Sequence, residues 1–174
     1  MAFTAHPGAL YNVVGSFNNY FITQLTGAGL PAWMPSAVTN FEYPALPLTF
    51  PSFSVTHLST DPEPIAQGQN LDPGYRGYRR RGLVEISVWE SVQRAGGAHI
   101  RNVQQMRDMA ARPFATGANV IILDLYAGTA NPSGLTARLA CGPVRDAPTP
   151  QDQNPDILRR RMLVPYEWLE RVSV

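Results

Sequence analysis

The chain has 174 residues, of which 44% are hydrophobic and 16% charged, and its formal net charge is +1. This length suits a single domain, residues 1–174, that buries roughly 70% of its unfolded surface, and the composition excludes a disordered, highly charged chain. A net charge near zero gives no global attraction to nucleic acid or to anionic membranes, so any such attraction requires a local cluster of charge.

All 14 basic residues are arginine. Arginine suits desolvated interfaces because it pairs with carboxylates through two N–H groups, although a GC-rich coding genome produces the same bias. The single cysteine, Cys141, excludes an intramolecular disulfide and is expected to be a buried, inert thiol. No stretch is long and apolar enough for a membrane span or a secretory signal, so we expect a soluble, unexported protein.

The first half of the chain begins with apolar residues at helical spacing, which predict an amphipathic helix over residues 10–25. Prolines then interrupt residues 27–47, where we expect a long irregular connection. Residues 48–58 are predicted to form a strand, and Pro51 suggests that it lies at an edge or contains a bulge. Residues 59–74 are rich in Asp, Pro, Gly and Gln and are expected to form a loop that is functional or is ordered by a partner.

The middle of the chain contains the clearest strand pattern, over residues 75–91. Val84, Ile86 and Val88 point one way, and the residues between them point the other way. After a Gly-Gly break, residues 98–114 are predicted to form a second amphipathic helix. Its expected inner face consists of Ile100, Val103, Met106, Ala110 and Phe114.

The last third contains two short apolar runs, residues 120–126 and 135–141, which are predicted to be strands. Residues 143–155 are expected to be flexible, and residues 159–172 alternate as a strand that needs a sheet partner. The order of elements shows no repeat and no regular βαβ alternation. We therefore expect an α+β fold, a mainly antiparallel sheet with two amphipathic helices packed on one face and long Pro/Gly-rich loops.

The sequence lacks the motifs that catalysis and cofactor binding usually require. It contains no nucleophile elbow and no phosphate-binding loop, and its three histidines, His6, His57 and His99, lack the spacing of zinc ligands. A lone histidine is more commonly a hydrogen-bonded group than a catalytic base. We therefore predict that the protein is not an enzyme and has no metal, cofactor or catalytic residues.

Two arginine triplets are the most distinctive charged features, and each lies at the start of a predicted strand. If the two strands are neighbours, up to six guanidiniums converge near one end of the sheet and attract DNA phosphates or the carboxylates of a partner. A solvated strand end is the alternative. The candidates for subunit or DNA contact are Arg79, Arg80, Arg81, Arg159, Arg160 and Arg161.

Aromatic residues supply the remaining candidates, because they are concentrated in interface hot spots. Trp33, Tyr75 and Tyr78 are predicted to anchor loops. Trp89 and Trp168 are expected to pack within the sheet, since large aromatic side chains are mostly buried.

In the order of these elements the chain resembles the tail terminator proteins of long-tailed bacteriophages, the lambda-type family also called tail completion proteins. The resemblance covers most of the chain and is one of element order, without a residue-level signature motif. The segments that carry it are the helix 10–25, residues 50–55 (FPSFSV), the strand 82–89 (GLVEISVW), the helix 98–114 and the closing strand 161–168. The chain departs from shorter family members by three long stretches, residues 27–47, 59–74 and 143–155.

The resemblance implies a virion structural protein that assembles in the host cytoplasm as a ring, typically a hexamer. Such a ring sits on the head-proximal end of the finished tail tube, stops polymerisation and offers a surface to the head-side connector or stopper protein. DNA later passes through its central hole, where non-specific contact with the lumen is expected. The arginine triplets are then candidates for the lumen or for a subunit contact.

Two other functions fit the same sequence. One is another neck component, such as a head-tail stopper or adaptor, or a minor tail protein. The other is a small α+β enzyme or ligand-binding domain, in which the long loops cover a pocket. A ring distinguishes the structural readings from the enzyme, which would be a monomer or dimer with a concave site and titratable groups of perturbed pKa.

Overall fold

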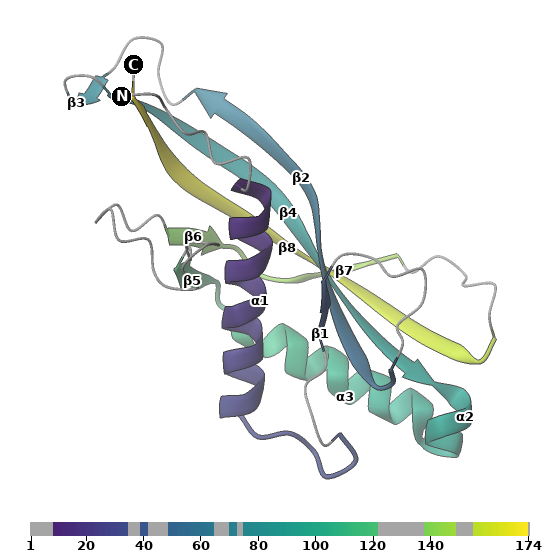
Figure 1. Ribbon diagram of the computed structural model, residues 1–174. Helices are drawn as coiled ribbons and strands as arrows, with labels where there is room; N and C mark the ends of the chain where they lie inside the picture. Colours follow the sequence, from purple (N-terminus) through teal and green to yellow (C-terminus); the bar gives the residue numbers. More distant parts are fainter. Residues whose placement is uncertain are drawn as a thin grey trace.

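The structure is a computed structural model that describes residues 9–34, 39–41, 49–64, 70–72, 75–121, 138–148 and 155–173. It confirms the predicted α+β class, with one sheet and helices packed against it (Figure 1). The helices are α1 (Ala9–Gly27), α2 (Val92–Ala95) and α3 (His99–Ala111), with short 3-10 turns at Gly96–Ala98 and Arg112–Phe114. The strands are β1 (Thr39–Phe41), β2 (Ser52–Pro64), β3 (Asn70–Asp72), β4 (Tyr75–Ser91), β5 (Ala118–Ile121), β6 (Arg138–Cys141), β7 (Arg145–Ala147) and β8 (Ile157–Ser173).

The sheet is mainly antiparallel and has the strand order β1-β2-β4-β8-β6-β5, with β3 paired to β4 and β7 paired to β8. Only the pairing of β1 with β2 is parallel among the described strands. β4 lies at the centre because its 17 residues provide a partner for β2 on one side and for β8 on the other, and its second half places Val84, Ile86 and Val88 on the core face.

The core lies between one face of the sheet and the two long helices. On α1, the residues at helical spacing, Val13, Phe17, Phe21 and Leu25, are buried as predicted. Phe17 stacks on Phe114 with ring centroids 4.8 Å apart. α3 confirms most of its predicted inner face, but Ile100 is 69% exposed. This expectation was wrong because Ile100 lies in the first turn of α3, at the margin of the buried face that is centred near Met106.

Three segments expected to be irregular contain strands. Residues 39–41, within the expected irregular connection 27–47, form β1, which pairs with β2. Residues 59–64 continue β2, and residues 70–72 form β3, so the predicted loop 59–74 is wrong. Pro62 and Pro64 suggested a loop, yet an edge strand tolerates proline because its outward N–H groups have no ladder partner. Within 143–155, residues 145–147 form β7, paired with β8. β5 and β6 overlap the predicted strands 120–126 and 135–141 at residues 120–121 and 138–141, and the rest of both predictions, residues 122–137, lies outside the described residues.

Three strands continue past the helices as a projection, which Figure 1 shows beyond the upper end of α1. We call it the arm: residues 59–64 of β2, 75–82 of β4 and 166–173 of β8. β4 pairs with β8 throughout the arm and with β2 as far as Tyr78, beyond which β3 pairs with β4. β6 pairs with β8 only at the base of the arm, at residues 166 and 167. The arm is therefore a narrow, three-stranded extension of the sheet.

Candidate functional site

The two arginine triplets lie on neighbouring strands, β4 and β8, but they do not converge. The strands are antiparallel, and their register places Arg81 opposite Glu167 and Arg161 opposite Ser87. Six positions along the ladder separate these two pairs, a distance of roughly 20 Å at about 3.3 Å per residue. The expectation of six guanidiniums at one sheet end is therefore wrong, because antiparallel pairing puts one triplet in the arm and the other at the opposite end of β8.

The second triplet is organised by a buried carboxylate. Glu85 is 1% exposed and lies on β4, on the face of the sheet opposite to the helices. Arg159 donates to its Oε1 at 2.9 Å, and Arg161 donates from Nε to its Oε2 at 2.9 Å. Ser87 Oγ donates a further bond of 2.7 Å to Oε1. Two of the six candidate arginines thus hold β8 against β4 through charge-assisted hydrogen bonds.

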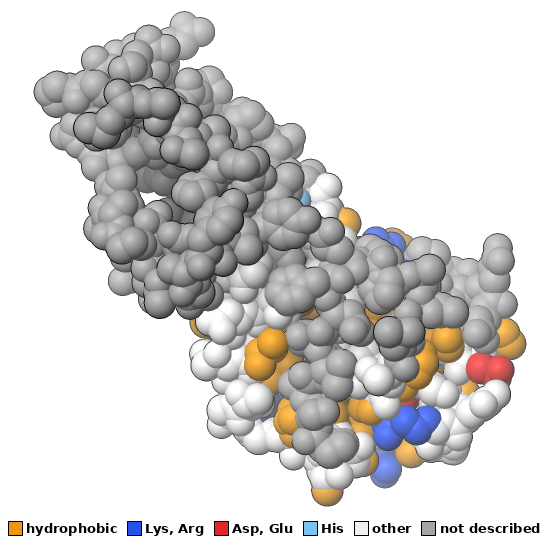
Figure 2. All heavy atoms as spheres, in the orientation of Figure 1, with side chains coloured by type: hydrophobic (Ala, Val, Ile, Leu, Met, Phe, Trp, Pro, Cys, Tyr) orange, Lys and Arg blue, Asp and Glu red, His pale blue; other side chains and the backbone are white. Residues whose placement is uncertain are grey.

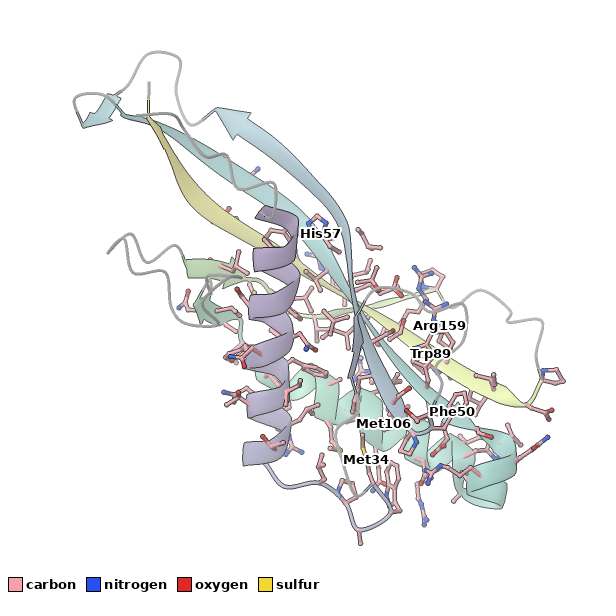
Figure 3. The ribbon with its side chains drawn as sticks, viewed as in Figure 1. Met34, Phe50, His57, Trp89, Met106 and Arg159 are labelled. Atoms are coloured by element: carbon pink, nitrogen blue, oxygen red, sulfur yellow. The ribbon has the colours of Figure 1, made fainter. Side chains whose placement is uncertain are left out.

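Arg159 is packed as well as paired. Its guanidinium lies 4.3 Å from the ring centroid of Trp89, as Figure 3 shows for the two labelled side chains. Trp89 is 3% exposed and donates from Nε1 to Ser54 Oγ at 3.0 Å. Trp89 is therefore part of the packed sheet, as predicted, and it adds a cation–π contact to the Arg159–Glu85 pair.

Arg160, the middle residue of the triplet, differs from its neighbours. It is opposite Val88, so strand alternation directs it to the other face of the sheet from Arg159 and Arg161. Its side chain is exposed. Alternation along β8 thus places the partly buried Arg159 and Arg161, which share Glu85, on one face of the sheet, and the exposed Arg160 on the other.

The first triplet lies in the arm, where the register brings acidic residues beside it. In the strand register, Arg81 lies opposite Asp61 of β2 on one side and Glu167 of β8 on the other. Its Nε lies 3.5 Å from Glu167 Oε2, with both side chains about half exposed. In the register, Arg79 lies opposite Glu63 and Leu169, and Arg80 lies opposite Pro62 and Trp168.

The aromatic candidates lie in two separate regions. Trp33 follows α1, packs against the core and donates from Nε1 to Gln105 Oε1 of α3 at 3.1 Å. This contact ties the segment after α1 to α3, which is the geometry of a loop anchor. Tyr75 and Tyr78 lie in β4 within the arm, at register positions opposite Ser173 and Glu170. Trp168 lies opposite Arg80, also in the arm.

A second buried carboxylate, Glu90, was not among the predicted sites. It is fully buried, and it accepts from Arg94 Nη2 at 2.8 Å and from Asn102 Nδ2 at 3.1 Å. The hydrogen bond between Arg94 and Glu90 raises the pKa of Arg94. Glu85 and Glu90 share one sequence signal, an acidic residue inside the strongly apolar pattern of β4, because a buried carboxylate requires a partner.

The described histidines and the cysteine each lie in a hydrogen-bonded or buried environment. His57 Nε2 lies 2.5 Å from the Tyr166 hydroxyl, and His99 Nδ1 bonds the Gly96 carbonyl, while His6 lies outside the described residues. Burial raises the pKa of Cys141 to about 12, so its thiol stays protonated at neutral pH. No cluster of metal-ligating side chains occurs within the described part of the chain.

None of the helices in the described ranges has the length and apolar character needed to cross a bilayer.

Comparison with known proteins adds information on the fold alone. No protein-family model matches the chain, and no curated protein matches it. Among solved structures, 21 chains match. One of them is similar over 92% of this chain and 95% of its own length, with a TM-score of 0.50 and 11% sequence identity. At 11% identity this likeness supports the α+β architecture.

Proposed function

We propose that this protein is a structural subunit of a long-tailed bacteriophage virion, a tail terminator that forms a ring, typically a hexamer, at the head-proximal end of the tail tube. The ring covers the last exposed interface of the tube, so that no further tube subunit can add, and it presents its other side to the head connector or stopper protein. Its activity is surface complementarity, without covalent chemistry.

The arm is the observation that carries this proposal. Among the described residues no helix covers the arm beyond its base (Figure 1), and a sheet needs a hydrophobic face or a packing surface to be stable. In an oligomer, that surface is supplied by a neighbouring subunit or by the tube. The visible part of the described surface, in which hydrophobic and uncharged groups outnumber charges (Figure 2), also suits an assembly.

The edges of the arm support a protein that assembles without polymerising. The outer edge of β2 carries Pro62 and Pro64, which have no N–H to donate to an added strand. Prolines on an edge strand prevent open-ended edge-to-edge pairing between free copies. A terminator requires this property, since it must join a ring and then stop growth.

Local pairing of the arginine triplets also fits a ring that DNA crosses. Arg159 and Arg161 share Glu85, and Arg81 lies 3.5 Å from Glu167. Within the second triplet, Arg160 is therefore the lumen candidate. A weakly charged channel favours passage, since tight non-specific binding depends on many phosphate contacts.

The direct test is inhibition of tube growth. Cognate tail tube protein is polymerised with the purified full chain, and tube lengths are measured by negative-stain electron microscopy. We expect short tubes that carry extra density at one end. Leu169→Asp, which places a charge in the arm, should abolish this effect, whereas Thr23→Asp on the exposed side of α1 should retain it. Unchanged tube lengths with the unmodified chain would refute the proposal.

A further inference from the structure

Four strands lose their regularity at the same level of the sheet, where the arm meets the helix-covered half. β2 has a bulge between His57 and Ser59, which inserts Leu58. β4 has Gly82 at this level, and β8 has Pro165 opposite the next residue of β4. On the side of β8 away from β4, the two short strands β6 and β7 both pair with β8, and residues 142–144 between them belong to neither strand. We call this level the bend line.

Each irregularity weakens the ladder in a known way. A bulge leaves one residue unpaired and increases the local twist. Proline has no N–H for the ladder, and a glycine in a strand weakens it because it has no side chain to pack. The connection between β6 and β7 stays attached through one bond, from Gly142 N–H to the Pro165 carbonyl at 2.8 Å. Figure 1 shows the three long strands twisting sharply near the middle of their length.

The two faces of the bend line differ. On the helix side, α1 and the β5–β6 pair pack into the same core as Tyr166, which blocks movement in that direction. On the opposite face lies a shallow hollow, lined by Arg81, Gly82, Ala140, Gly142, Pro165 and Glu167. The hollow leaves space on this face, so the arm can bend toward it.

One side-chain contact spans the bend line. His57 lies at the level of Val84 and Val164, on the helix-covered side of the bulge, and Tyr166 lies in the arm opposite Gly82. Their side chains meet with 2.5 Å between His57 Nε2 and the Tyr166 hydroxyl, near the point where Figure 3 labels His57. This bond connects β2 to β8 across β4 and restrains the arm.

We propose that the bend line is a conformational device, a hinge that sets the angle of the arm relative to the helix-covered half. The His57–Tyr166 bond limits the range of this angle. This inference concerns the isolated chain, so it stands or falls independently of the tail terminator function. The arm extends eight residues from Leu83 to Tyr75, or about 26 Å, so a swing of about 10° moves its tip by roughly 5 Å.

Double electron–electron resonance, which measures the distance between two spin labels, tests the proposal. Nitroxide labels are attached through Arg101→Cys on the exposed side of α3 and Ser173→Cys at the end of β8, while Cys141 remains unlabelled because it is buried. Tyr166→Phe removes the hydroxyl that contacts His57 across the bend line and should widen the distance distribution. Deletion of Leu58 removes the bulge and should shift the mean distance and narrow the distribution.

Two controls make the outcome decisive. Tyr20→Phe removes a hydroxyl within the helix-covered half, 3.5 Å from the Pro113 carbonyl, and should leave the distribution unchanged. A label pair at Thr23→Cys and Arg101→Cys should report the same distance in every variant. If the Leu58 deletion unfolds, as circular dichroism would show, Tyr166→Phe alone decides. An unchanged distribution in Tyr166→Phe would overturn the proposal.

Discussion

Glu85 stabilises the contact between β4 and β8 on the face of the sheet opposite to the helices. It is one buried carboxylate that serves two arginines, so its replacement leaves two guanidiniums close together without their shared counter-charge. We predict that Glu85→Gln lowers the free energy of unfolding by about 3 kcal/mol, the range observed when one partner of a buried ion pair is removed. Urea denaturation followed by circular dichroism measures this change. A loss close to zero would show that the pair is not structurally important.

Arg160 provides the matched comparison within the same triplet. Because its side chain is exposed, Arg160→Gln should change the free energy of unfolding by no more than about 0.5 kcal/mol. If the exposed guanidinium contacts a partner, the same variant should weaken assembly, measured as the fraction of capped tubes. Replacing all three arginines with glutamine is a poor test, because it would remove the two that stabilise the sheet. Undiminished capping by Arg160→Gln would exclude Arg160 from the interface.

Cys141 gives the fold a predictable response to alkaline pH. Burial raises the pKa of its thiol from an ordinary 9.0 to about 12, so the folded state holds a proton that the unfolded state loses first. This contribution to stability is fully present below about pH 9 and is lost as the pH rises toward about 12. We predict a steeper alkaline loss of stability, measured by urea denaturation at a series of pH values, for the natural chain than for Cys141→Ala. Equal slopes would contradict the assignment.

At the scale of elements, the packing of α1 against the end of α3 rests on the stacked pair Phe17 and Phe114. Phe114→Ala should cost about 4 kcal/mol of unfolding free energy, because it removes a fully buried ring. Ile100→Ala, on the exposed turn of the neighbouring helix α3, should change it by less than about 0.5 kcal/mol. Thermal denaturation distinguishes the two variants, and similar losses would place Ile100 in the core after all.

The sequence predicts elements well where one periodicity persists. β4 spans the predicted 75–91, where Val84, Ile86 and Val88 alternate with the residues between them, and α1 extends the predicted 10–25 by a residue or two at each end. Pro62 and Pro64 led to a predicted loop where β2 continues, since local residue preference does not show whether a strand lies at an edge. The arginine triplets were misplaced for a related reason: the direction and register of β8 against β4 are tertiary facts.

For the whole molecule, the α+β class follows from the order of elements, and the structure confirms it. The candidate site was only partly predictable. Residue type identified the arginines, but burial and pairing divided them into Arg159 and Arg161, which stabilise the sheet, and Arg160, which is exposed. Tail termination remains a prediction, because subunit contacts depend on surfaces whose partners are not encoded in a local pattern.

The central claim is that this chain works as one of several copies in a closed ring on a tube. Cryo-electron microscopy of tail tubes assembled with the full chain tests it most directly, by counting the copies and locating them. We predict a closed ring at one end of each tube, with the arm buried against a neighbouring copy or the tube. Single copies scattered along the shaft, or a chain that never joins the tube, would contradict it.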